Sequence, residues 1–311
     1  MIDRLRDRSI VAAYRAGTVV ARVTPPSVTG AVSRVAGRAA ASRSSDRRTM
    51  VERNHRRIAG PGLSDAELDR LVTASYQNYT RYFLQSFRLP SMSVDDVAAG
   101  FTVEGIEHLE AAMADDEVGP VLALPHLGGF EWAAYWITQV RRWGLAAVVE
   151  RLEPPELFEW FRDFRRSLGI NVIPLGPDAA TQIVDAAANR EVVCLLCDRD
   201  LLGGGPTVTF FGEETTLPAG PAVMALKGGC RVLPTAVYFS ERGVHGVIRP
   251  PVTIEREVGA TSIRGDVARF TQVLASELEI LIGAAPEQWL VMQPNWPSDF
   301  EALGRPAPSR P

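Results

Sequence analysis

Short apolar runs alternate with segments of helical periodicity from about residue 100 onward. The runs are rich in Val, Ile, Leu and Ala, which is typical of buried strands. They predict strands at 101–105, 121–124, 146–151, 171–175, 192–200, 207–212, 231–240 and 243–254, the last two as an antiparallel pair. Helical patterns cover 106–114, 131–142, 155–168, 178–189, 218–228 and 261–282. This order of elements predicts an α/β fold, with a mixed central β-sheet flanked by helices on both faces.

The first 90 residues carry helical patterns only. Residues 2–23 and 27–41 predict two helices with Val and Ala near one face and Arg elsewhere. Ser64 and Glu67 have the spacing of a capping box, and a long helix with a Leu and aromatic stripe follows. Pro90 ends that helix. We assign the aromatic stripe to the protein core.

Charge is unevenly distributed along the chain. Residues 1–60 contain thirteen Arg and four Asp or Glu, a net charge of +9, whereas the remainder holds 20 basic and 33 acidic residues. A basic segment on an acidic body predicts an anionic partner, either nucleic acid or an anionic membrane. The first two helices are therefore either an ordinary surface pair or membrane-associating helices that direct Arg toward lipid headgroups. We divide the chain into basic amphipathic helices (1–57), one α/β domain (58–305) and a loose tail (306–311).

The cysteines and the apolar stretches exclude several classes of protein. Three Cys do not form a disulfide framework, and a reducing cytosol is expected. Cys194 and Cys197 lie on one predicted strand, where residues three apart face opposite sides, so they are assigned to the core rather than to a metal or redox site. The N-terminus lacks the pattern of a signal peptide. No uncharged apolar stretch reaches the ~18–20 residues that a spanning helix needs.

A histidine follows the predicted central strand directly. His126 comes after Pro125, and Gly128, Gly129 and Glu131 follow it. Ligands of α/β proteins bind at the carboxyl ends of strands, and glycine permits a tight turn and close approach of a substrate. Histidine can accept a proton at neutral pH, and a carboxylate bonded to its second ring nitrogen fixes the tautomer. His126 and Glu131 are therefore a candidate catalytic pair that deprotonates a hydroxyl, with a buried structural histidine as the alternative.

Charged residues also follow two other predicted strands. The first cluster consists of Glu150, Arg151, Arg162, Arg165 and Arg166. Its arginines suit phosphate recognition, although an exposed charged helix has the same composition. The second cluster consists of Asp198, Arg199 and Asp200, ahead of three glycines. Because strand ends meet at one edge of a sheet, we expect both clusters to lie near His126.

Several longer motifs are shared with a known family. They are ERNHRRI (52–58), YQNYTRYFLQSFRLP (76–90), PHLGGFEW (125–132), FRRSLG (164–169), DRDLLGGGPTVTFFGEETTLPAGPAVMAL (198–226) and PEQWLVMQPNWP (286–297). With these motifs the chain resembles the bacterial lipid A biosynthesis lauroyl/myristoyl acyltransferase family, and within it the actinobacterial phosphatidylinositol mannoside acyltransferases. That family usually has H-x4-D. Glu131 departs from this pattern, but its longer side chain can still reach His126. The DRDL form favours the mannoside branch.

The resemblance implies a peripheral enzyme on the cytoplasmic face of the plasma membrane. It would transfer a fatty acyl group, palmitoyl from acyl-CoA as co-substrate, to a mannose hydroxyl of a phosphatidylinositol mannoside, with no cofactor, no metal and no nucleic acid. Carried over, His126 would be the general base and Glu131 would orient it or help to bind the acceptor. Five residues would shape the substrate sites: Glu150, Arg165, Asp198, Arg199 and Asp200. Either aspartate could assist His126.

An acyltransferase that acts on another glycolipid remains open at this point, as do two other functions. Asp198-Arg199-Asp200 also matches the D-x-D motif with which many glycosyltransferases hold a divalent metal and a sugar nucleotide. A non-catalytic membrane-binding protein would depend on residues 1–57 alone. Neither alternative explains His126 and Glu131. The chain contains no G-x-S-x-G nucleophile elbow, so direct attack by a histidine-activated hydroxyl is simpler than a covalent acyl-enzyme.

Overall fold

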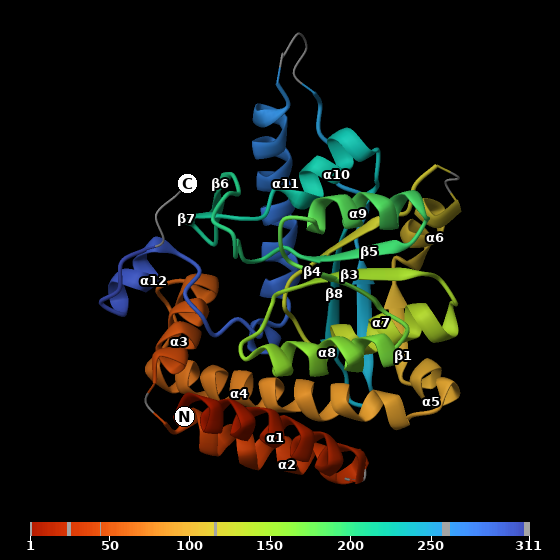
Figure 1. The fold of residues 1–311 in the computed structure, drawn as a ribbon. Helices are drawn as coiled ribbons and strands as arrows, with labels where there is room; N and C mark the ends of the chain where they lie inside the picture. Colours follow the sequence, from red (N-terminus) through yellow and green to blue (C-terminus); the bar gives the residue numbers. More distant parts are fainter. Residues whose placement is uncertain (1, 24–25, 44, 115–116, 257–261, 308–311) are drawn as a thin grey trace.

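A seven-stranded sheet forms the centre of the computed structural model, which describes residues 2–23, 26–43, 45–114, 117–256 and 262–307 (Figure 1). The strand order is β1-β9-β8-β2-β5-β3-β4. The strands are β1 (Phe101–Glu104), β2 (Val121–Leu124), β3 (Leu145–Val149), β4 (Asn171–Pro174), β5 (Val192–Leu196), β8 (Val232–Phe239) and β9 (Val244–Ile248). β8 and β9 pair antiparallel, and the other neighbours in this sheet pair parallel. The predicted mixed sheet and its antiparallel pair are confirmed.

Helices cover both faces of this sheet, as predicted (Figure 1). One face carries α9 (Ala179–Ala188), α10 (Gly220–Gly228) and α11 (Arg264–Gly283), and the other carries α5 (Val94–Ala99), α6 (Ile106–Ala114), α7 (Phe130–Tyr135) and α8 (Pro155–Ser167). Because strand side chains alternate, Val121 and Ala123 pack in the first core and Leu122 and Leu124 in the second. The same alternation separates the cysteines, with Cys197 in the first core and Cys194 against the second.

Four helices precede the sheet: α1 (Ile2–Val23), α2 (Pro26–Ala41), α3 (Asp46–Ala59) and α4 (Asp65–Arg88). The predicted capping box at the start of α4 is present. α2 packs closely on α4 at Gly37, where a Cβ would lie 2.5 Å from the Cα of Gln77. Tyr14 of α1 packs edge-on against Phe83 and Phe161. No helix in the described part of the chain has the length and apolarity to cross a bilayer.

Several elements were not predicted because their sequences are polar or irregular. They are α3, α5, β7 (Glu213–Thr216), which pairs with β6 (Thr207–Phe210) in a separate hairpin, and α12 (Pro297–Ala302). The predicted helix at 131–142 is α7 followed by the π-helix η2 (Trp136–Val140). The predicted boundary after residue 57 falls in the last turn of α3. In the predicted tail, residues 308–311 lie outside the described residues.

Candidate active site

The candidate residues follow three neighbouring parallel strands, whose carboxyl ends lie at one edge of the sheet. β2 ends before His126, β5 ends before Asp198, and β3 ends before Glu150. β5 lies between β2 and β3 and pairs parallel with both. The cleft that holds His126 is also lined by Glu150 and Arg165 of the first predicted cluster and by Arg199 and Asp200 of the second. The other arginines of the first cluster, Arg151, Arg162 and Arg166, do not line it.

Asp198 is the carboxylate that binds the ring of His126. One carboxylate oxygen lies 2.7 Å from the ring Nδ1, and the other accepts a hydrogen bond of 2.8 Å from the backbone N–H of His126. Asp198 is fully buried, whereas the His126 side chain is 29% exposed. Burial alone would raise the pKa of Asp198, but the attraction to His126 and the hydrogen bonds it accepts hold this pKa below its usual value.

The C-terminal segment completes this pair. The indole Nε1 of Trp289 donates a 2.6 Å hydrogen bond to Asp198, and the side-chain amide of Asn295 donates to the backbone carbonyl of Asp198 at 2.8 Å.

The PEQWL stretch (286–290) also fixes the backbone on both sides of His126. The backbone N–H of Leu290 donates to the carbonyl of His126 at 2.7 Å, and the N–H of Gly128 donates to the carbonyl of Gln288 at 3.0 Å. From the sequence, PEQW was identified only as part of a resemblance, and no role was predicted for it. The structure shows that it holds the histidine and its aspartate in place.

The turn after His126 requires glycine. Gly128 has a φ of +58°, and a Cβ at this position would lie 2.0 Å from the backbone carbonyl oxygen of Val237. Any other residue would push the turn away from β8 and displace the histidine that precedes it. The predicted tight turn is present, but the close neighbour of Gly128 is the backbone of β8 rather than the substrate that was expected there.

The expected bond between Glu131 and the ring of His126 is not formed. The Glu131 carboxylate is buried on the first turn of α7 and accepts hydrogen bonds from Arg165 at 2.7 and 2.9 Å and from the hydroxyl of Tyr82 at 3.1 Å. Glu131 does not reach the ring because α7, which begins at Phe130, directs its side chain toward α4 and α8. Asp198 instead approaches the ring of His126 from the end of the neighbouring strand. Tyr82 was assigned only to the core, and its contact with Glu131 was missed.

The Glu131–Arg165 pair is a buried ion pair. Their side chains are 3% and 17% exposed, respectively. Burial alone would lower the pKa of Arg165, but the charge of Glu131 outweighs it and raises this pKa. Burial, together with the charge of Glu131, raises the pKa of Tyr82 well above its usual value, so this phenol stays protonated and donates. Removing one partner would leave an uncompensated buried charge, which is strongly destabilising.

The remaining predicted residues lie around the same cleft. Glu150 is exposed at the rim. Arg199 is half-buried, and its Nε has no hydrogen-bond partner among the residues that the structure describes. The Asp200 carboxylate accepts hydrogen bonds from the backbone N–H groups of Gly203 and Gly205, at 3.0 and 2.8 Å. Asp200 therefore holds its own loop, and Asp198 alone of the two aspartates binds the histidine.

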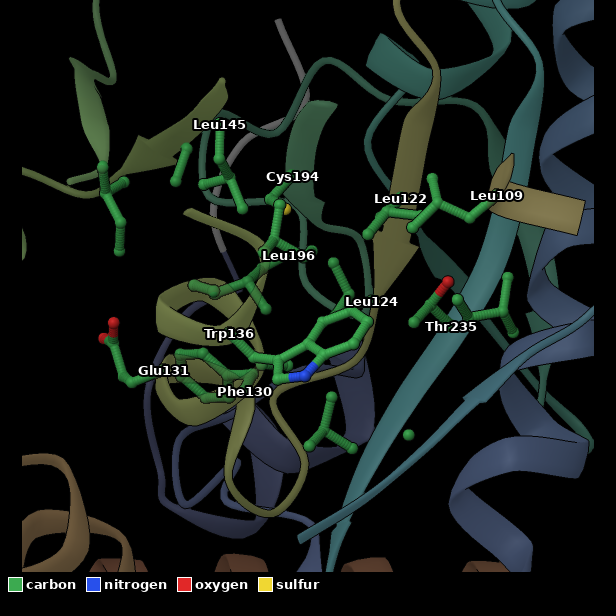
Figure 2. A pocket seen from close by; sticks show the side chains of 18 of the residues that line it. Leu109, Leu122, Leu124, Phe130, Glu131, Trp136, Leu145, Cys194, Leu196 and Thr235 are labelled. Carbon is green, nitrogen blue, oxygen red and sulfur yellow. The ribbon is translucent and has the colours of Figure 1, made fainter. Parts of the chain in front are cut away.

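Two cavities meet at this site. The first is an open cleft of about 560 Å³, whose wall includes His126, Glu150, Arg165, Arg199 and Asp200. The second is an inner cavity of about 80 Å³ between the sheet and α7, with an almost wholly apolar lining (Figure 2). The residues that line both are Phe130, Val148, Val149, Arg165 and Leu196. We call this shared region the neck; Glu131 lies beside it on the inner side.

The basic stretch before α4 supports the site from a distance. Arg53 and Arg57 of α3 donate to one oxygen of the buried Asp299 carboxylate, at 2.7 and 2.6 Å. The other oxygen accepts from the backbone N–H of Asn295 at 3.1 Å, and Arg57 lies 4.1 Å from the ring centre of Trp296. These contacts hold the segment that carries Trp289 and Asn295 against the rest of the domain.

The geometry favours base catalysis by histidine and disfavours cysteine chemistry. An ionised carboxylate only accepts hydrogen bonds, so the ring Nδ1 carries the proton and Nε2 is left as the basic nitrogen. Burial, with a contribution from the charge of Glu131, raises the pKa of Cys194 to about 12, and burial raises that of Cys197 as well. Thiols with raised pKa values are poor nucleophiles at neutral pH.

Comparison with known proteins shows to which family the chain belongs. The family model described as bacterial lipid A biosynthesis acyltransferase matches residues 4–298. The chain is 39% identical, over 242 residues, to a phosphatidylinositol mannoside acyltransferase of Mycobacterium tuberculosis (strain CDC 1551 / Oshkosh), covering 76% of this chain and 73% of the relative. It is 34% identical, over 291 residues, to the protein of that name in Mycolicibacterium smegmatis, covering 92% and 91%. The chain therefore belongs to the bacterial lipid A biosynthesis acyltransferase family.

Proposed function

We propose that this acyltransferase moves a long fatty acyl group, palmitoyl from acyl-CoA, to a mannose hydroxyl of a phosphatidylinositol mannoside. The observation that carries the proposal is the His126–Asp198 pair on the wall of an open cleft that adjoins an apolar cavity. The acceptor class rests on the names of the two mycobacterial relatives. In this proposal His126 is the general base, and Asp198 fixes its tautomer and stabilises the imidazolium that forms.

The reaction needs one base and no enzyme nucleophile. Nε2 of His126 takes the proton of the acceptor hydroxyl while that oxygen attacks the thioester carbonyl carbon. The carbon–oxygen bond forms, the carbonyl electrons move to oxygen, and the tetrahedral intermediate then collapses with cleavage of the carbon–sulfur bond. The departing thiolate takes the proton back from His126, so the histidine ends the cycle neutral.

The inner cavity suits the acyl chain. Its lining comes from the sheet, α6, α7 and η2 and is almost entirely apolar. Each buried methylene contributes ~0.8 kcal/mol, so a long chain would be strongly retained there. The neck would hold the thioester carbonyl between the apolar cavity and His126. We assign Glu131 the role of fixing Arg165 at this neck rather than of binding the histidine.

Charged groups at the cleft suit phosphorylated substrates. Within the described part of the chain the buried Nε of Arg199 has no partner, and Arg165 lines both cavities. Guanidinium groups bind phosphate oxygens well, and both acyl-CoA and a phosphoinositide carry phosphate. Glu150 at the rim can accept hydrogen bonds from sugar hydroxyls. The D-x-D alternative lacks support, because the Asp198 and Asp200 carboxylates bind different groups of the protein.

A lipid acceptor requires contact with a membrane, and we assign this contact to α1 and α2 at the cytoplasmic face. Val19, Val20 and Val23 of α1 and Val28 and Val35 of α2 are exposed, with Val23 at 74% and Val35 at 73%. Exposed arginines occur on the same two helices. Apolar side chains with neighbouring cations are typical of helices that lie on anionic bilayers.

The test is transfer by the purified protein. Palmitoyl-CoA and a mixed phosphatidylinositol mannoside extract are supplied, and products are identified by mass spectrometry. We expect an acylated mannoside with the wild type and none with His126→Ala. His108→Ala, which changes a histidine on α6 away from the cleft, is the matched control and should retain activity. Transfer that persists in His126→Ala would refute the base assignment, and the absence of any acylated mannoside with the wild type would refute the acceptor.

A further inference from the structure

One motif of the N-terminal segment has no part in the proposed function. It is ERNHRRI (52–58), which forms most of the second half of α3. The net charge of +9 in residues 1–60 predicted an anionic partner for this segment. The side chains of Arg53 and Arg57, however, are only 30% and 9% exposed, and both bind the buried Asp299 carboxylate. Their charge is therefore used inside the protein rather than presented to a membrane.

The motif binds the chain that follows the PEQWL stretch at two separate points. Figure 1 shows α3 beside α12, and hydrogen bonds join the two regions. The buried side-chain amide of Asn54 donates to the backbone carbonyl of Val291 at 3.0 Å. Arg53 and Arg57 donate to the hydroxyl of Ser298, at 2.7 and 2.9 Å. Because residues four apart lie on one face of a helix, the two guanidinium groups act on the same site.

Residues 291–299, which we call the anchored segment, reach the catalytic pair through Asn295. The backbone N–H of Asn295 donates to the second oxygen of Asp299 at 3.1 Å, and its backbone carbonyl accepts from the hydroxyl of the buried Thr215 of β7. With this backbone fixed on both sides, the side-chain amide donates to the carbonyl of Asp198 at 2.8 Å. The anchored segment therefore directs one hydrogen bond at the backbone of the catalytic aspartate.

This hydrogen bond acts where the strand no longer fixes the chain. The register of β5 with β2 ends at Leu196, and the N–H of Cys197 donates to the carbonyl of Leu124 at 2.8 Å. Asp198 lies beyond that bond. Rotation of its peptide group would turn its carboxylate away from the ring of His126. A donor on its carbonyl therefore stabilises the orientation that the catalytic pair needs.

We propose that Asn295 is a positioning residue of the catalytic pair. Arg53 and Arg57 hold it in place through the carboxylate of Asp299, so α3 serves catalysis rather than the membrane. The proposal rests on the proposed function, because it takes the ring of His126 as the base. It predicts that substitutions outside the wall of the cleft lower the rate of the chemical step without weakening substrate binding.

The first test removes the donor. Asn295→Ala should lower kcat for acyl transfer by about 10–100-fold, while KM for palmitoyl-CoA stays within about threefold of the wild type. Asn295→Asp keeps the size of the side chain but also lacks the donor, and it should lower kcat at least as much. Asn189→Ala is the matched control, because it removes an exposed amide at the C-terminal end of α9 and should keep the wild-type kcat. Urea unfolding checks that each variant is folded.

The second test separates positioning from membrane charge. Arg57→Gln should lower kcat about tenfold or more. Arg56→Gln should keep it, because Arg56 lies on the same helix but is 51% exposed and pairs with the exposed Asp65. Each variant loses one positive charge, so sedimentation with anionic vesicles should change to the same extent in both. The double variant Arg57→Gln/Asn295→Ala should have the kcat of Asn295→Ala alone, because the arginine acts through Asn295.

A readout without turnover separates the positioning role from the proposed reaction. The Nδ1 proton of His126 gives a downfield resonance in NMR spectra when it is hydrogen-bonded to a carboxylate. This resonance should shift or weaken in Asn295→Ala and in Arg57→Gln but not in Arg56→Gln. An unchanged resonance in Asn295→Ala, a kcat within about threefold of the wild type, or additive losses in the double variant would overturn the positioning role. A shifted resonance would support that role even if the wild type transferred no acyl group, which would refute the proposed function alone.

Discussion

Replacing Asp198 with Asn tests the catalytic pair most directly, because it removes a charge without changing the size of the side chain. One carboxylate oxygen faces the ring Nδ1 of His126, and the other accepts from the backbone N–H of His126 and from the indole of Trp289. All three groups are donors, and an amide offers only one acceptor oxygen. An asparagine at this position must therefore direct its NH₂ group at one side or the other.

The two orientations have different costs. If the NH₂ group faced the backbone and the indole, two hydrogen bonds at a fully buried site would be lost, at about 1–3 kcal/mol each. If it faced the ring, the ring would change tautomer, so that Nδ1 accepts and Nε2 carries the proton. The second orientation keeps the hydrogen bonds from the backbone N–H of His126 and from the indole of Trp289, and it is therefore favoured. It removes the basic nitrogen from the cleft, and the same substitution in Ser-His-Asp triads lowers kcat by ~10⁴-fold.

We therefore expect Asp198→Asn to lower kcat for acyl transfer by about 10³–10⁴-fold, while urea unfolding shows a folded protein. The matched control is Asp200→Asn, which alters a carboxylate that binds only its own loop and should cost less than about tenfold. Nitrogen chemical shifts of the His126 ring report the tautomer independently of activity. An Asp198→Asn protein that retains kcat within tenfold of the wild type would refute the role assigned to this carboxylate.

Three further outcomes follow from other parts of the molecule. Trp289→Phe removes the indole donor to Asp198 and should raise the pKa of that carboxyl and lower kcat about tenfold, as measured in a pH–rate profile. Burial lowers the pKa of His55 to about 4, so below about pH 6.5 the unfolded chain binds more protons than the folded protein does. The free energy of unfolding should therefore fall by about 2 kcal/mol between pH 7 and pH 5, as measured by urea unfolding. His55→Gln should not show this fall. The double variant Val23→Asp/Val35→Asp should no longer sediment with anionic vesicles, because it places charge on the exposed apolar positions of α1 and α2. Val184→Asp, at an exposed position of the distant α9, is the control. Unchanged sedimentation of the double variant would contradict the membrane assignment.

The elements that were predicted correctly have either a continuous apolar run or a clear helical period in their sequences. β2, β5 and α4 have clear apolar patterns, and the Ser64–Glu67 capping box marked the start of α4. β7 was missed because its sequence, EETT, has no buried apolar alternation, and it is a strand only because β6 pairs with it. α3 was missed because its apolar positions are few. Two of its arginines, Arg53 and Arg57, bind Asp299, and Arg57 also binds Glu213; both partners are far away in the sequence.

The sequence predicted where the candidate site lies but not which carboxylate binds the ring of His126. The reason is that residues close together along the chain need not be close together in the sheet. Glu131 is five residues from His126, yet the first turn of α7 carries it to Arg165 of α8. Asp198 is 72 residues away, yet β2 and β5 are parallel neighbours whose ends coincide. Spacing along the sequence cannot reveal which strands are adjacent. Strand order decides which carboxylate reaches the histidine, and the comparison of Asp198→Asn with Asp200→Asn tests that consequence of the fold directly.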